Sequence, residues 1–141
     1  MFLLDANVLI ALGEAQHPHG DSALRFFEEH AVREGWATCP LTENAFLRIL
    51  GNPSYPQGPG STAAARDLLA KITAAPGHQF WPDAHSLLAA RRFPRLPAAR
   101  HLTDHYLLAL AVSRHARMAT FDRTLDPNLV PGGPLALHLL T

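Results

Sequence analysis

The sequence has a single cysteine, Cys39, and therefore no partner for an intrachain disulfide. Lys71 is its only lysine, and none of its apolar runs is long enough to span a membrane. Positive and negative side chains balance, with 12 of each, so no overall charge attracts nucleic acid. The N-terminus also lacks the basic stretch of a signal peptide. We therefore expect a cytoplasmic protein with no membrane partner, in which any RNA contact depends on a local basic patch.

The sequence does contain enough apolar residues for a substantial core. Hydrophobic residues make up 48% and charged residues 17% of its 141 positions, which is typical of a globular rather than a disordered chain. This length fits one domain. No internal repeat or linker interrupts the chain, and we expect one domain over residues 1–141.

Apolar segments alternate with stretches of helical periodicity along the chain. The apolar segments predict strands at 2–4, 36–39, 78–81, 117–121 and 135–140. The periodic stretches predict helices at 6–12, 21–34, 42–50, 62–72, 83–92 and 103–112. The residues suited to cap these helices include Asp21 or Ser22, Thr42, Ser61 or Thr62, and Thr103. The alternation predicts an α/β fold with three layers, α/β/α, and a central, mostly parallel sheet.

Four acidic residues occupy unusually apolar surroundings. Asp5 interrupts the run from Phe2 to Ile10, where a buried carboxylate is costly unless it is paired, hydrogen-bonded or bound to a metal. Glu43 and Asp122 follow the second and fourth predicted strands, and Asp104 begins an apolar helix. Ligands of parallel sheets bind beyond the carboxyl ends of the strands. We therefore expect all four acids at one edge of the sheet.

Each of these acids also has a purely structural explanation. Asp104 and Glu43 lie in the first turn of a helix, where the helix dipole favours an acid by about 0.3–1 kcal/mol. Asp122 could open a turn, and Asp5 with Asn7 could form a turn and helix cap. Four such coincidences at one edge are far less probable together than singly.

Clustered carboxylates repel one another and take up protons unless a cation is present. Oxygen ligands of this kind suit Mg²⁺ or Mn²⁺, and the nine histidines show no zinc-binding pair. Such a cation can activate water and stabilise a leaving oxygen. The pattern therefore points to metal-dependent cleavage of a phosphodiester, with Asp5, Asp104 and Asp122 as metal ligands and Glu43 as a further ligand or a base.

Four segments of the sequence resemble the acidic signature of a PIN domain. They are Leu4-Asp5-Ala6-Asn7, Thr42-Glu43, Thr103-Asp104 and Thr120-Phe121-Asp122. Their order and spacing, and the length of the chain, most resemble the VapC-type toxins of bacterial toxin–antitoxin pairs. The resemblance covers essentially the whole chain, and the Glu43 segment is its least specific part.

This resemblance implies a Mg²⁺- or Mn²⁺-dependent endoribonuclease that forms a homodimer and is inhibited by a cognate antitoxin protein. It implies that the catalytic acids are Asp5, Glu43, Asp104 and Asp122. Asn7 would orient Asp5 or a metal-bound water, while Thr103 and Thr120 would support the acids. A housekeeping PIN-type nuclease would share the same acids.

Two further alternatives remain open from the sequence. A phosphohydrolase of small phosphoesters could use an acidic edge, although no Gly-rich phosphate loop occurs. A non-catalytic module could bind RNA or a protein through the same cleft. Substrate-binding residues are not identified by any motif, and the segments 51–60 and 91–100 are candidate RNA contacts.

Overall fold

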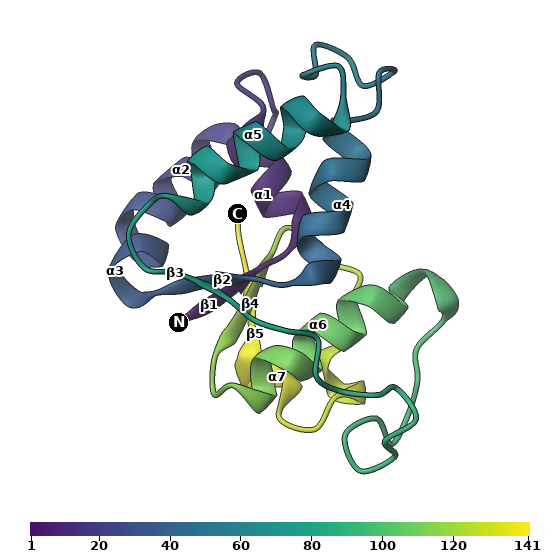
Figure 1. Ribbon diagram of the computed structural model, residues 1–141. Coiled ribbons are helices and arrows are strands. Elements are labelled where there is room, and N and C mark those ends of the chain that lie inside the picture. Colours follow the sequence, from purple (N-terminus) through teal and green to yellow (C-terminus); the bar gives the residue numbers. More distant parts are fainter.

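A five-stranded sheet runs through the centre of the computed structural model, which describes residues 1–141 (Figure 1). Every neighbouring pair of strands is parallel. From one edge to the other, the strands are β3 (His78–Phe80), β2 (Trp36–Thr38), β1 (Phe2–Leu4), β4 (Arg117–Thr120) and β5 (Leu137–Leu139). The predicted α/β fold with a central parallel sheet is confirmed.

Helices cover both faces of this sheet (Figure 1). On one face lie α1 (Ala6–Gly13), α2 (Gly20–Phe26), the π-helical turn η1 (Phe27–Ala31), α3 (Val32–Glu34), α4 (Pro40–Leu50) and α5 (Thr62–Thr73). On the other lie α6 (Leu102–Ser113) and α7 (Gly133–Ala136), with the short 3₁₀ turns η2 (Ala99–His101) and η3 (Pro127–Leu129). None of these helices has the length and apolar character needed to cross a membrane.

The sheet divides the apolar residues into two cores. Successive strand residues point to opposite faces, so Phe2 and Leu4 pack with Trp36 under the α1–α5 layer. Leu3 points the other way and joins Met118 beneath α6. Residues 105–111 of α6 are all buried, which fits a helix that is apolar around most of its circumference.

The helix starts differ from the sequence-based expectation at several positions. Ser61 does cap α5, accepting a hydrogen bond from the Ala64 N–H at 3.1 Å. α4 begins earlier than expected, since Cys39 is its N-cap and Thr42 lies inside its first turn. There the Thr42 hydroxyl accepts the Cys39 N–H at 3.0 Å.

Two other predicted N-caps are also wrong. α2 begins at Gly20, before both expected caps, Asp21 and Ser22, and has His19 at its N-cap. The 3₁₀ turn η2 leads directly into α6, whose N-cap is His101. Thr103 is therefore an exposed residue within the first turn rather than a cap.

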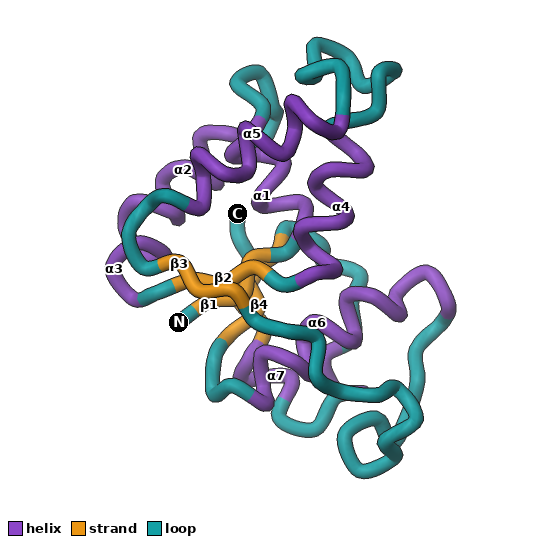
Figure 2. Tube along the Cα trace, in the orientation of Figure 1, coloured by secondary structure: helices purple, strands orange, loops and turns teal.

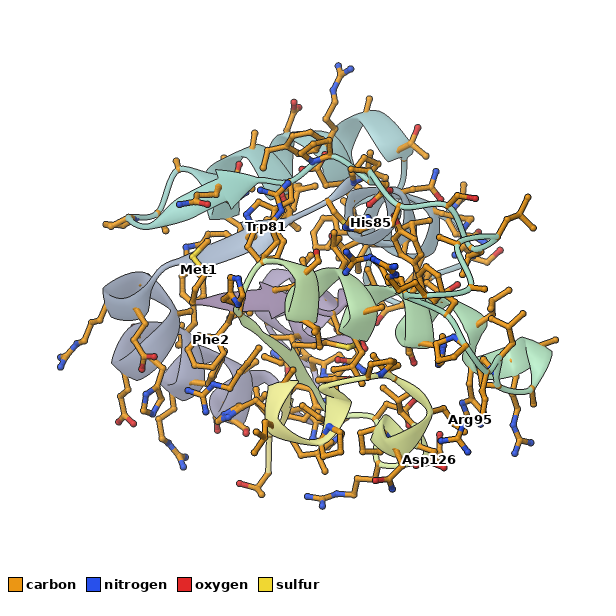
Figure 3. The ribbon with its side chains drawn as sticks, turned by 90° about the horizontal axis from the view of Figure 1, so that it is seen from below. Met1, Phe2, Trp81, His85, Arg95 and Asp126 are labelled. Carbon is orange, nitrogen blue, oxygen red and sulfur yellow. The ribbon has the colours of Figure 1, made fainter.

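The predicted helix at 83–92 is absent, and this segment is part of a long irregular connection between β3 and α6 (Figure 2). The Ser86 hydroxyl accepts the Leu88 N–H at 3.1 Å, a local bond that competes with helical hydrogen bonding. Buried Trp81 and Phe93 anchor the connection. Figure 3 shows Trp81 and His85 on the α6 side of the sheet, where His85 Nε2 lies 3.1 Å from Ser113 Oγ.

The C-terminal segment also departs from the expected strand at 135–140. Gly132 adopts a left-handed conformation, with φ of 78°, and starts the short helix α7. β5 is consequently limited to Leu137–Leu139 and pairs with β4 at the sheet edge.

Replacement of Leu108 by Ala tests the core beneath α6. Leu108 is completely buried, and we expect its loss to lower the free energy of unfolding by about 2–5 kcal/mol. Leu88→Ala is the matched control, because Leu88 is 93% exposed and its truncation removes almost no buried surface. Chemical denaturation of both variants measures the difference, and equal stabilities would contradict the packing described here.

Candidate active site

Asp5 follows β1 at the carboxyl edge of the sheet and is 5% exposed. Its Oδ1 accepts the Ala6 N–H at 2.7 Å, so Asp5 caps α1, and its Oδ2 accepts the Thr120 hydroxyl at 2.7 Å. Burial raises the pKa of Asp5 in spite of both hydrogen bonds, and the charge of Asp122 raises it further. The two hydrogen bonds thus fix the position of the carboxylate but do not offset the full free-energy cost of burying its charge.

The buried hydroxyl of Thr120, at the end of β4, connects this carboxylate to its neighbours. While donating to Asp5, its oxygen accepts Asn7 Nδ2 and the Asp122 N–H, each at 3.0 Å. Asn7 in turn accepts the Phe121 N–H at 3.3 Å through its Oδ1. The single hydroxyl hydrogen and both lone pairs of Thr120 are therefore used, which fixes the direction of every bond in the network.

Asp104 and Asp122 complete a group of three aspartates. Burial raises the pKa of Asp104 to about 7, and the nearby Asp5 and Asp122 carboxylates contribute to the rise. The pKa of Asp122 falls below its ordinary value: burial alone would raise it, but hydrogen bonds from the Thr124 N–H (2.8 Å) and hydroxyl (2.6 Å) outweigh that effect. Residues from β1, α6 and β4 thus meet at one edge.

Glu43 lies on α4 at the same edge but faces another strand. Its Oε2 accepts the Thr38 hydroxyl at 2.8 Å. Thr38 Oγ1 also lies 2.8 Å from His78 Nε2, and since the only hydroxyl hydrogen points to Glu43, His78 is the donor of this second bond. Glu43 is therefore held by residues of β2 and β3, apart from the mutual contacts of the three aspartates.

Of the three residues expected to support the acids, Thr120 bonds directly to Asp5, and Asn7 reaches Asp5 only through Thr120. Thr103 makes no hydrogen bond to an acid and lies exposed on α6.

The oxygen-only composition of this group suits a hard divalent cation, although its side chains do not form a complete coordination shell. No three His, Cys, Asp or Glu side chains converge in metal-binding geometry. The raised pKa values of Asp5 and Asp104 show that both carboxyl groups are driven toward their neutral forms. A cation bound between them would relieve the same repulsion that a proton relieves, and Mg²⁺ retains several waters among its ligands.

Asp83 is a further acid at this edge that the sequence-based interpretation missed. It lies three residues beyond the end of β3, after Trp81, whose N–H donates to the Thr38 carbonyl at 2.8 Å and so extends the pairing with β2. The prediction of a helix at 83–92 made Asp83 an ordinary helix-start residue. Its place after an apolar segment is the signal that could have identified it.

Comparison with known proteins supports a family assignment. The PIN domain model matches residues 2–126. Ribonuclease VapC44 of Mycobacterium tuberculosis is 41% identical over 141 residues, covering 99% of this chain and 97% of that protein. The chain belongs to the VapC-type ribonucleases of the PIN-domain family. Ribonuclease VapC39 of the same organism is 42% identical over 132 residues, which is 92% of this chain and 94% of VapC39.

Solved VapC structures share the fold. VapC20 of M. tuberculosis, a Sarcin-Ricin loop cleaving toxin, superposes with a TM-score of 0.61 at 14% identity, covering 88% of this chain and 92% of VapC20. VapBC2 from Rickettsia felis, bound to a DNA fragment from their promoter, gives a TM-score of 0.63 at 12% identity and covers 99% and 98% of the two chains. The expected relation to VapC-type toxins, and with it ribonuclease activity, is confirmed.

Loss of the Thr120 hydroxyl tests the hydrogen-bond network of this VapC-type ribonuclease. Thr120→Val keeps the side-chain shape but removes the partner of Asp5 Oδ2, of Asn7 Nδ2 and of the Asp122 N–H. We expect a loss of about 1–3 kcal/mol in unfolding free energy and a fall in RNA cleavage. Thr120→Ser retains the hydroxyl and should restore both properties; failure of serine to restore cleavage would contradict a hydrogen-bonding role.

The raised pKa of Asp104 predicts a pH-dependent stability of the metal-free protein. The unfolded chain releases this proton near the ordinary value of 3.8, but the folded protein releases it at about 7. The stabilisation is complete below the lower value and is lost as the pH rises through the upper one. We expect the melting temperature to fall by a few degrees from about pH 5 to about pH 8.

Asp104→Asn should abolish part of this fall and raise the melting temperature at about pH 8, because it removes a charge from the repelling group. Thermal melts with a chelator present provide the measurement. A lower melting temperature of this variant at both pH values would instead indicate a structural role for Asp104.

Proposed function

We propose that this VapC-type ribonuclease is a Mg²⁺- or Mn²⁺-dependent endoribonuclease toxin that hydrolyses RNA phosphodiester bonds. One observation supports this most strongly: Asp5, Asp104 and Asp122 come from three distant segments at the ligand-binding edge of a parallel sheet. Burial raises the pKa of Asp5 and of Asp104 there, and the neighbouring carboxylates raise both further. A cluster of this cost is expected where a cation is bound.

Asp5, Asp104 and Asp122 would hold the cation in this proposal. The cation, when bound, would supply charge to neutralise the phosphate and lower the pKa of an attacking water. Asp104 would give up its proton on cation binding, since its pKa of about 7 is set partly by its two neighbours. Thr120 and Asn7 would keep Asp5 oriented through the hydrogen bonds described above.

Glu43 would accept the proton of the attacking water. Its position supports this role, because Thr38 and His78 orient it at the same edge without drawing it into the three-aspartate group. In-line attack by water breaks the bond to the 3′ oxygen and leaves a 3′-hydroxyl and a 5′-phosphate. Attack by the ribose hydroxyl would instead leave a 2′,3′-cyclic phosphate.

The partners follow from the same assignment. We propose that a cognate antitoxin neutralises the enzyme, that the enzyme acts as a homodimer, and that its RNA substrates are cytoplasmic. The VapBC2 complex of R. felis supports the expectation of an antitoxin through its shared fold.

Cleavage of total cellular RNA by the purified protein tests the activity. We expect discrete fragments with Mg²⁺ or Mn²⁺ and none with a chelator. Asp104→Asn should reduce cleavage by more than roughly 100-fold, the upper end of the cost of losing a residue that only supports a ligand. Asp67→Asn, a matched change at an exposed site on α5, should leave cleavage unchanged.

Sequencing of the fragment ends and an assay with small phosphoesters separate the alternatives. Fragments that end in 2′,3′-cyclic phosphate would contradict hydrolysis by water. Turnover of small phosphoesters without RNA fragments would favour a phosphohydrolase, and binding of RNA without any cleavage would favour a non-catalytic module.

A further inference from the structure

A cavity of about 330 Å³ opens between the starts of α4 and α6 and the connection that follows β3. One wall is the first turn of α6, where Thr103 adjoins Asp104. Leu41, two residues before Glu43, forms a second wall. The connection after β3 contributes the third wall through Asp83 and Leu87. The volume is at the lower end of the roughly 300–1,000 Å³ that small-molecule sites occupy.

Apolar side chains form much of this cavity, and part of its lining is fixed by contacts within the protein. Leu41, Leu87 and Leu102 supply apolar surface. Tyr106 is 5% exposed, and its hydroxyl accepts the His85 N–H at 3.4 Å. The His85 ring is hydrogen-bonded in turn to the Ser113 hydroxyl. Figure 3 labels His85 on the α6 side of the sheet. The connection thus holds a defined shape against α6.

Asp83 is the acidic group of this cavity, and its exposed carboxylate forms no ion pair. Its partner within the protein is the Cys39 thiol at the end of β2, which is only a weak hydrogen-bond donor. Burial raises the pKa of that thiol to about 11, and the charge of Asp83 and its hydrogen bond with Cys39 add to the rise. Asp83 is therefore available to an external hydrogen-bond donor.

The combination of apolar walls and one carboxylate selects the chemistry of an occupant. A phosphate would be repelled by Asp83, and a purely apolar group would leave the carboxylate with only the weak Cys39 thiol as a donor. A nucleobase satisfies both requirements, since its faces are apolar and its edge carries N–H groups. Unpaired bases are the parts of RNA that proteins read in this way.

We propose that this cavity binds the base next to the cleaved phosphodiester, and that Asp83 selects guanine. The inference rests on the proposed ribonuclease function. Guanine alone presents two adjacent donors, N1–H and N2–H, to a single carboxylate. Adenine and uracil place acceptors beside their donors, and cytosine offers only its amino group. The Thr103 hydroxyl, which makes no hydrogen bond within the protein, lines the same cavity and is a donor for guanine O6.

Cleavage of matched RNA oligonucleotides tests this assignment. The oligonucleotides carry guanine, adenine, cytosine, uracil or hypoxanthine at one position beside the cleaved bond. Wild-type protein should cut the guanine substrate roughly tenfold faster than the adenine substrate, the discrimination expected of a two-bond contact. Hypoxanthine lacks the N2 amino group, so its substrate should be cut at an intermediate rate.

Asp83→Asn should remove the preference for guanine while changing the rate for the adenine substrate little. Asp67→Asn is the matched control and should keep the wild-type preference. Retention of the preference in Asp83→Asn, or an equal loss of rate for every base, would overturn the assignment. So would metal-dependent cleavage by wild-type protein that is indifferent to the base at every flanking position, a result that leaves the proposed function standing.

Binding separates this inference from a failure of cleavage. If no RNA is cut, the proposed function fails, and fluorescence anisotropy with labelled guanine- and adenine-containing oligonucleotides in Ca²⁺ still measures the preference and its loss in Asp83→Asn. Equal binding of all oligonucleotides would overturn the inference. An Asp83→Asn variant with unchanged RNA preference but weakened inhibition by its antitoxin would assign the cavity to that protein instead.

Discussion

Repulsion among three carboxylates at one edge of the sheet is the constraint on which the active site depends. Burial raises the pKa of Asp5 and Asp104, and repulsion from the neighbouring carboxylates of this group raises both further. The Thr120 hydroxyl offsets part of this cost by joining Asp5 to Asn7 and to the Asp122 backbone. The two apolar cores stabilise the fold enough to offset the remaining free-energy cost of burying these charges. They also fix the elements that present the acids.

The parallel topology determines which residues can meet in this way. β1 lies at the centre of the order β3-β2-β1-β4-β5, so residues that follow β2 and β4 flank Asp5 on either side. On one face, α1–α3 connect β1 to β2 and α4 and α5 connect β2 to β3, while α6 returns on the opposite face toward β4 (Figure 1). Residues separated by more than 100 positions, such as Asn7 and Thr120, therefore form direct hydrogen bonds.

Much of this arrangement could be predicted from the sequence because it depends on periodicity. The buried strands at Phe2–Leu4, Trp36–Thr38 and Arg117–Thr120 are apolar on both faces, and an acid follows each of them closely. Parallel pairing then brings the acids to one edge. This reasoning applies to Asp5, Glu43 and Asp122, whereas Asp104 lies in the first turn of α6 and follows none of these strands.

Features that depend on distant side chains could not be predicted. Glu43 accepts a hydrogen bond from the Thr38 hydroxyl, whose oxygen also contacts His78. His78 lies 35 positions beyond Glu43 in the sequence. The segment 83–92 has helical composition, but the Ser86 turn and the burial of Phe93 hold it irregular. Thr103 lost its predicted capping role because a 3₁₀ turn precedes α6. The same irregular connection brings Asp83 to the edge, which periodicity alone does not indicate.

Calorimetric titration with Mn²⁺ just below pH 7, in buffers of different ionisation enthalpy, tests most directly whether the three aspartates are a cation site. Since Asp104 has a pKa of about 7 and the pKa of Asp5 is also raised, we predict binding that releases protons, with a smaller release from Asp104→Asn. Absence of binding, or binding whose proton release is unchanged in that variant, would contradict the account.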